Sequence, residues 1–130
     1  MTIQAEARLN GLHISDKKVR LVVDLVRGLP IEQAYAQLSA MNKAARKPVM
    51  KLIKSAEANA VHNSKADAST LVIHTIQVNK GSMQYRSMPR ARGTAAPIRR
   101  HSCHVWVTLQ GTAPDAQPAS SEAVVEAKAE

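Results

Sequence analysis

Apolar and polar side chains alternate along the first nine residues of the chain. The apolar positions are Ile3, Ala5, Ala7 and Leu9, and polar residues stand between them. A period of two is typical of a β-strand that buries one face. We therefore expect a strand over residues 2–9.

The pattern then changes to the spacing of a helix. Ser15 is a candidate N-cap, and Gly28 followed by Pro30 marks the end of the segment. One face of this helix carries four valines, at Val19, Val22, Val23 and Val26. The opposite side carries a mostly basic stripe, formed by Lys17, Arg20, Asp24 and Arg27.

Two more helices are expected, over residues 31–41 and from a cap at Asn42 to about residue 60. The apolar face of the longer helix consists of Ala45, Val49, Leu52, Ile53, Ala56 and Ala60. A second basic stripe consists of Lys43, Lys47, Lys51 and Lys54. Pro48 must either kink this helix or delay its start, because proline lacks the backbone donor that a helix interior uses.

Residues 71–79 and 105–109 are rich in β-branched residues and predict two further strands. About 20 residues lie between them, which is unusual in a compact domain unless the segment is functional or disordered. If residues 80–101 form an extended hairpin with ten residues in each arm, it reaches about 33 Å. Such a hairpin would project clear of the core.

The charge of the chain is large and unevenly distributed. The 130 residues, enough for about one domain, hold 18 Lys and Arg against 10 Asp and Glu, for a net charge of +8. We expect one domain over residues 1–110, with a net charge of +11, and an acidic, mostly disordered tail over residues 111–130, with a net charge of −3. A strongly basic body favours a polyanionic partner, with nucleic acid ahead of a membrane surface.

The expected hairpin concentrates this charge. It contains six fixed cations and no acid, namely Lys80, Arg86, Arg90, Arg92, Arg99 and Arg100. Arginine binds phosphates through two parallel hydrogen bonds, so RNA or DNA is favoured over a merely solvated loop. With no Phe, one Trp and two Tyr, the chain lacks the rows of rings that a single-strand-binding sheet presents. Trp106 is therefore interpreted as structural.

Enzymatic and metal chemistry find little support. Cys103 is the single cysteine, so neither an internal disulfide nor a cysteine-pair metal site can form. On a strand, His101 and Cys103 would share a face while His104 points to the other, and no carboxylate lies near them in the sequence. We expect no cofactor, no metal, no small-molecule substrate and no catalysis. The chain also lacks a signal peptide and a membrane-spanning run, which favours the cytoplasm.

Four separated motifs resemble one family. The segments ISDKKVRLVVDLVRG, SAEANA, YRSMPRARGTA and IRRHSCHVWV are similar, in order and spacing, to the bacterial-type family of large-subunit ribosomal protein number twenty-two, over about residues 3–110. The resemblance implies an α+β fold of three helices packed on a small antiparallel three-stranded sheet, with a long projecting basic β-hairpin. It also implies a place in the ribosome, where the hairpin lines the nascent-peptide exit tunnel.

The resemblance implies three classes of partner: large-subunit rRNA, neighbouring large-subunit ribosomal proteins and the nascent polypeptide. With the basic stripes included, the candidate rRNA-binding residues are Lys17, Lys18, Arg20, Arg27, Lys43, Lys47, Lys51, Lys54, Lys80, Arg86, Arg90, Arg92, Arg99, Arg100, His101 and His104. The hairpin tip is expected at Met88, Pro89, Arg90, Ala91, Arg92, Gly93 and Thr94.

The chain departs from the family pattern at Thr94, where arginine is usual, and at His101, Ser102 and Cys103. Two other functions remain open on the residues alone. One is a free-standing DNA-binding or architectural protein that lays the hairpin in a groove. The other is a small hydrolase that uses Cys103 and a histidine, although the scattered acids do not favour it.

Overall fold

Strand β1 (Thr2–Leu12) begins a three-stranded antiparallel sheet in a computed structural model that describes residues 2–112. Strand β5 (Cys103–Thr112) is central, between β1 and β2 (Val72–Lys80). Every second residue of β5 faces the core, including the fully buried Val105, Val107 and Leu109. The alternation that predicted these strands is thus the alternation of a sheet with one covered face.

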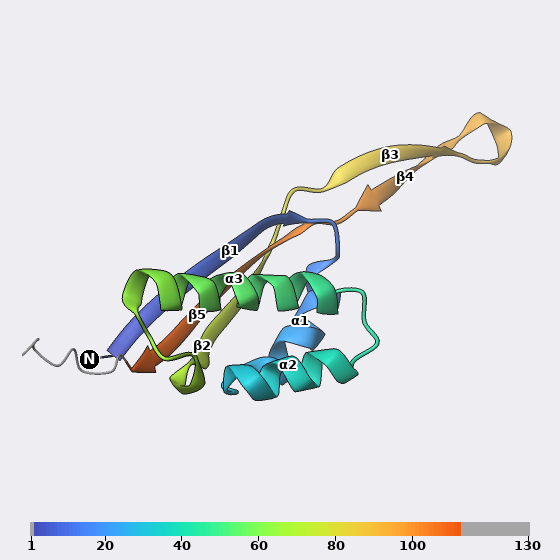
Figure 1. The fold of residues 1–130 in the computed structure, drawn as a ribbon. Helices are drawn as coiled ribbons and strands as arrows, with labels where there is room; N and C mark the ends of the chain where they lie inside the picture. The colour runs from blue at the N-terminus through green and yellow to red at the C-terminus, as the bar shows by residue number, and fades with distance from the viewer. Residues whose placement is uncertain (1, 113–130) are drawn as a thin grey trace, which may run out of the picture.

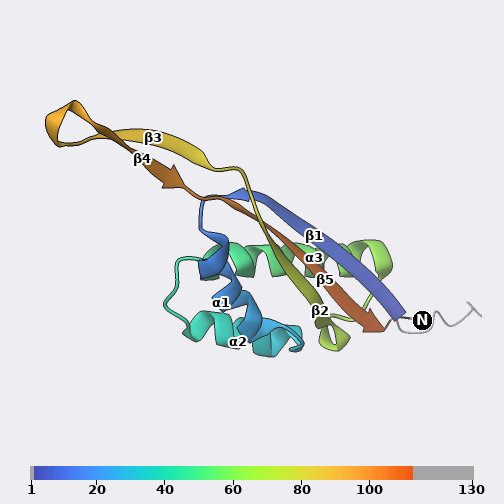
Figure 2. The ribbon, with the colours of Figure 1, turned by 180° about the vertical axis from the view of Figure 1, so that it is seen from behind.

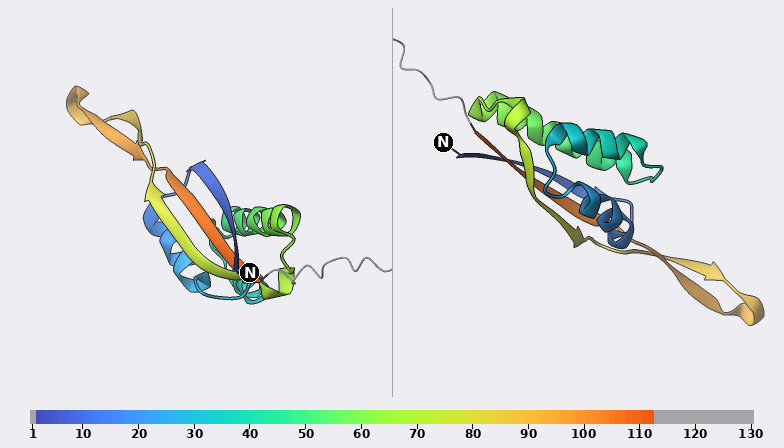
Figure 3. Two further views of the ribbon diagram at one scale, coloured as in Figure 1. Left: turned by 90° about the vertical axis from the view of Figure 1, so that its left-hand side faces the viewer. Right: turned by 90° about the horizontal axis from the view of Figure 1, so that it is seen from below.

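Three helices form the second layer, all on one face of the sheet (Figure 1; Figure 3, right). Helix α1 (Asp16–Val26) lies along β2, and α3 (Arg46–Ser64) lies along β1, with α2 (Ile31–Ala40) between them in sequence. A short 3-10 turn, η1 (Ala68–Thr70), leads into β2 and was not predicted. The predicted α+β class, with three helices on a three-stranded sheet, is confirmed.

The valine face of α1 and the predicted apolar face of α3 are buried, as their spacing indicated. Ser15 occupies the N-cap position of α1, but its side chain makes no capping bond and its Oγ instead lies 3.4 Å from Asp16 Oδ1. The predicted cap at Asn42 is wrong. Helix α3 begins at Arg46, which places Pro48 in the first turn, where a missing N–H costs nothing.

Strands β3 (Gln84–Pro89) and β4 (Ala95–Arg100) pair antiparallel as a separate two-stranded ribbon, joined by the 3-10 turn η2 (Ala91–Gly93). We call residues 80–101 the hairpin. It projects past the end of the sheet and away from the helices (Figures 1 and 2). The expected ten-residue arms are wrong: each paired arm has six residues, or about 20 Å. The acidic tail falls almost wholly outside the described residues.

Candidate nucleic-acid interface

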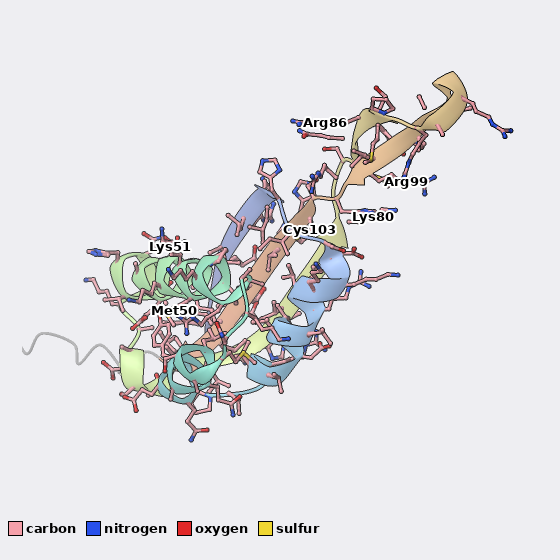
Figure 4. The ribbon with its side chains drawn as sticks, turned by 90° about the vertical axis from the view of Figure 1, so that its right-hand side faces the viewer. Met50, Lys51, Lys80, Arg86, Arg99 and Cys103 are labelled. Carbon is pink, nitrogen blue, oxygen red and sulfur yellow. The ribbon has the colours of Figure 1, made fainter. Side chains whose placement is uncertain are left out.

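The two faces of the hairpin both carry arginine. In the β3–β4 register Arg99 pairs with Tyr85 and Arg86 pairs with Ile98, so Arg86 and Arg99 lie on opposite faces (Figure 4). Every residue of β3 is exposed. None of the ion pairs found within residues 2–112 involves a hairpin residue. The ribbon therefore offers unpaired guanidinium groups in two directions, as a segment lodged between phosphate backbones would require.

The tip is closed by Thr94, at a position where the family resemblance predicted arginine. Its Oγ1 donates to Ala91 O at 2.8 Å, and its carbonyl accepts from the Arg90 amide at 2.8 Å. Arg92 and Gly93 both have positive φ, at 58° and 69°. A non-glycine residue in this region is uncommon, so the turn holds Arg92 at a conformational cost. The uncharged Thr94 side chain thus adds one hydrogen bond that holds the turn closed.

A basic pocket of about 490 Å³ lies at the root of the hairpin. Its lining consists of His13, Gln84, Arg86, Arg100 and His101. His13 was missed by sequence reasoning, because it belongs to the loop after β1 and nothing in the sequence links that loop to residues 84–101. The pocket has no acidic lining residue, so it fits a phosphate group.

A joint connects the hairpin to the sheet. Gly81 donates its amide to Ser102 O at 2.8 Å, and Ser102 Oγ donates to Ser82 O at 2.5 Å. His104 takes part on the other side, where its Nδ1 accepts the amide of Gly11 at 3.1 Å. Gly11 lies in the β1 bulge, opposite this histidine. His104, predicted to bind rRNA, thus has one ring nitrogen engaged within the fold and only Nε2 left for a ligand.

Two of the predicted helix-one cations support the sheet edge. Arg20 donates to Val78 O at 3.2 Å, and Arg27 donates to Ile76 O at 3.2 Å. Each arginine also forms an ion pair within α1, Arg20 with Asp16 at 3.5 Å and Arg27 with Asp24 at 3.1 Å. These carbonyls belong to β2, an edge strand, so the arginines occupy acceptors that another chain could otherwise use. Lys17 and Lys18 are exposed and have no such partner among the described contacts.

The second basic stripe divides between two sides of α3. Lys47 and Lys51 line an apolar groove against β1, whereas the Lys54 ammonium lies 5.9 Å from the ring centre of Tyr35 on α2. The Tyr35 hydroxyl donates to Glu57 at 2.6 Å, and burial together with this carboxylate raises the pKa of Tyr35 far above its usual value. Lys43 is exposed in the segment before α3. Lys80 is exposed at the end of β2, close to the joint (Figure 4).

The open face of the sheet carries Trp106, whose ring lies under Arg8 at 4.9 Å from guanidinium carbon to ring centre. This stacking supports the structural interpretation of Trp106. Cys103 is fully buried. Within residues 2–112 no three His, Cys, Asp or Glu residues lie close enough to hold a metal. No helix in that range is long and apolar enough to cross a bilayer.

The sequence matches the model of the family described as ribosomal protein L22p/L17e over residues 7–110. It is 46% identical over 109 residues to the large ribosomal subunit protein uL22 of Myxococcus xanthus, covering 82% of this chain and 96% of that protein. The corresponding values for uL22 of Mesoplasma florum are 44% over 107 residues, with 82% and 96% coverage. For uL22c of Oenothera argillicola they are 41% over 104 residues, with 80% and 76% coverage.

The chain belongs to the ribosomal protein L22p/L17e family. The resemblance stated from four motifs is therefore confirmed. The matched range ends at residue 110, two residues before the end of β5, so residues 113–130 lie beyond it.

Proposed function

We propose that this protein is a structural, non-enzymatic constituent of the large ribosomal subunit that binds large-subunit rRNA. Residues 1–110 act as one rRNA-binding domain, and the hairpin lines the peptide exit tunnel, where it meets the nascent chain. Neighbouring ribosomal proteins contact the remaining exposed surface. Membership of the L22p/L17e family and the names of its relatives support this proposal.

The observation that carries the proposal is the hairpin itself. It holds six fixed cations and no acid, its β3 side chains are all exposed, and it projects away from the three helices (Figures 1 and 2). A two-stranded ribbon is marginally stable in water, so the fold gains little from it. Its charges serve a partner: Arg86, Arg90, Arg92, Arg99 and Arg100 neutralise phosphates, while the root pocket takes one phosphate between Arg86, Arg100, His13 and His101.

The core contributes a second set of contacts. Lys17, Lys18, Lys43, Lys47 and Lys51 are exposed and have no ion-pair partner among the described residues, and the same holds for Lys80 at the base of the hairpin. Arg20, Arg27, Lys54 and His104 each contact the fold with part of the side chain, and half of the Arg20 and Arg27 side-chain surface stays exposed. We assign these four a mixed role, in which the same group braces the fold and contacts RNA.

To test the proposal, the five hairpin arginines are replaced with glutamine. This variant keeps the length of the chain and leaves the residues of the joint unchanged. Counterion release predicts that the salt slope of binding to an rRNA fragment falls by about four units. In cell lysate, the parent chain should stay with the large subunit through a high-salt wash, and the variant should be released. If the parent does not sediment with that subunit, or prefers a DNA duplex of equal phosphate number, the DNA-binding alternative replaces this proposal.

A further inference from the structure

An apolar groove with a basic rim lies between β1 and α3, on the side of the fold away from α1. Its volume is about 390 Å³. The floor is formed by Leu9, Leu12, Pro48 and Leu52, and the rim by Arg8, Lys47, Lys51 and Ser55. We call this surface the β1–α3 groove. Three of its eight lining residues are cations and none is an acid. Arg8 already pairs with Glu6 at 3.5 Å and lies over Trp106, whereas Lys47 and Lys51 have no ion-pair partner among the described residues. The groove therefore fits a segment that is both apolar and acidic.

The chain's own tail has that composition. Beyond Thr112 it contains the sequence Glu122-Ala123-Val124-Val125-Glu126, an apolar pair with an acid on each side. The tail carries four acids and one lysine, whereas the body carries a net charge of +11. It also lies outside the residues matched by the family, so no role in the family domain accounts for it.

We propose that, in the absence of RNA, the segment around Val124 and Val125 docks in the β1–α3 groove of the same molecule. The two valines would cover the leucine floor, while Glu122 and Glu126 would pair with Lys47 and Lys51. Docking would occupy Lys47 and Lys51, which we propose as RNA contacts, so the tail would compete with RNA. That consequence rests on the proposed function, whereas docking itself does not.

The reach of the tail permits this contact. Thr112 pairs with Thr2 at the end of the sheet opposite the hairpin. The groove begins at Arg8, six residues along β1, and ends at Leu12, so it lies about 20–33 Å from Thr112. Val124 is twelve residues beyond Thr112 and can be up to about 40 Å away. The tail can therefore reach the groove without leaving its own molecule.

The geometry of α3 supplies matched charge variants. Lys51 lines the groove, whereas Lys54, one turn further along the same helix, lies over Tyr35 on the α2 side. Changing either lysine to glutamate alters the net charge equally. Only Lys51→Glu places a negative charge where the tail would dock, so the pair separates local docking from general attraction between the tail and a basic body.

The first test uses RNA-free, full-length protein labelled with ¹⁵N and carrying a nitroxide at Ser121→Cys, since Cys103 is buried and will not take the label. We expect the amide signals of Leu9, Lys51 and Ser55 to lose at least about half of their intensity, and those of Leu21 and Leu25 on α1 to be unchanged. Lys51→Glu should abolish the loss, and Lys54→Glu should preserve it. Equal effects of the two variants would overturn the proposal.

Two further results would also overturn it. Broadening centred on α1, or spread evenly over the body, would mean that the groove is not the docking site. Broadening in a mixture of nitroxide-labelled ¹⁴N protein with unlabelled ¹⁵N protein would mean that a second copy supplies the tail. Because no RNA is present, these outcomes leave the rRNA-binding proposal untouched.

The second test measures the competition with RNA at constant charge. Val124→Ser/Val125→Ser removes the apolar contact and leaves every charge in place. We expect this variant to bind an RNA duplex probe about threefold more tightly than the parent at 0.1 M salt, because the open groove becomes the dominant state. Equal affinities of the parent and the variant would contradict competition by a docked tail.

Discussion

The hydroxyl of Ser102 donates a hydrogen bond to the carbonyl oxygen of Ser82, 2.5 Å away, across the base of the hairpin. Ser102 is the one polar residue among those buried within residues 2–112. The amide of Gly81, next to Ser82, donates to Ser102 O. Ser102 therefore connects the two arms of the hairpin through both its side chain and its backbone. The direction of the hairpin relative to the sheet is therefore fixed by a few atoms at this joint.

We expect Gly81→Ala to disturb the joint. A methyl carbon at residue 81 would lie 2.6 Å from Ser102 Oγ and 3.1 Å from the Ser102 carbonyl carbon, so Ser102 would have to move. The free energy of unfolding should fall by about 1–3 kcal/mol, as is usual for overpacking. Hydrogen exchange should accelerate at the amides of residues 81–84. Urea unfolding and exchange measurements check the two effects separately.

Ser102→Ala provides the control for that prediction. Loss of the hydroxyl should cost about 1 kcal/mol, the usual net value of one hydrogen bond. The double variant should be more stable than the sum of the single effects indicates, because the closest clashing atom is then gone. If the effects of the two substitutions on the free energy of unfolding are strictly additive, the clash with Ser102 Oγ is not the cause of the destabilisation by Gly81→Ala.

Arg27→Ala should destabilise the fold even in the absence of RNA. The guanidinium group donates to Ile76 O on the edge of β2 and pairs with Asp24. We expect a loss of about 1 kcal/mol in urea unfolding, from the hydrogen bond and the packed aliphatic stem. Lys17→Ala, on the outward face of the same helix, should change stability by less than about 0.5 kcal/mol. Equal losses of stability in Arg27→Ala and Lys17→Ala would show that Arg27 does not stabilise the edge of β2.

The stability contributed by Asp16 should depend on pH. Burial acts to raise the pKa of this carboxyl, but the Lys17 amide, the Arg20 charge and the Ser15 hydroxyl outweigh it, and the folded pKa lies below 3.8. The carboxylate therefore stabilises the fold above pH 3.8, and this contribution disappears as the pH falls through the folded pKa. Asp16→Asn should cost about 0.5–1 kcal/mol at pH 7. In urea unfolding the difference in stability between the parent and the variant should shrink steadily as the pH is lowered below 3.8.

Cys103 should be almost unreactive in the folded protein. Its side chain is fully buried in β5, and burial, aided by the Asp16 carboxylate, raises the pKa of the thiol. A disulfide reagent at pH 8 should react about a hundredfold more slowly than with a free thiol, and at the free rate in denaturant. Rapid reaction in native buffer would show that β5 opens readily, in conflict with its central place in the sheet.

Local patterns predicted the elements because each pattern reports which face of an element is buried. The valines of α1 and the alternation in β1 were sufficient to place both elements to within a few residues. The start of α3 was predicted wrongly because two local signals conflict. Asn42 is a favourable N-cap residue, but a helix that began there would place Pro48 in its interior, whereas a start at Arg46 places Pro48 in the first turn. That start also lets the Arg46 side chain donate to Ser39 O and Met41 O at the end of α2.

The candidate site was predicted from the sequence as a set of basic residues. The structure shows which of these residues are exposed without a partner and which already contact other parts of the fold. Within residues 2–112 the hairpin arginines make no ion pair, as their acid-free sequence indicated. Arg20, Arg27 and His104 contact backbone groups far away in sequence, and such contacts leave no local signal. His13 was missed for the same reason. A basic residue type indicates what a side chain can bind, and only the fold shows what it already binds.

The central position of β5 has a consequence for how the chain acquires its fold during synthesis. Both β1 and β2 pair with β5, although β5 is the last of the described strands to be translated. Until residue 112 has left the ribosome, β1 has no partner strand and the helices have no complete surface to pack on. Folding must therefore wait for nearly the whole domain, through contacts of high sequence separation that close slowly. The arginine-rich hairpin is exposed to cellular polyanions before the core behind it can form.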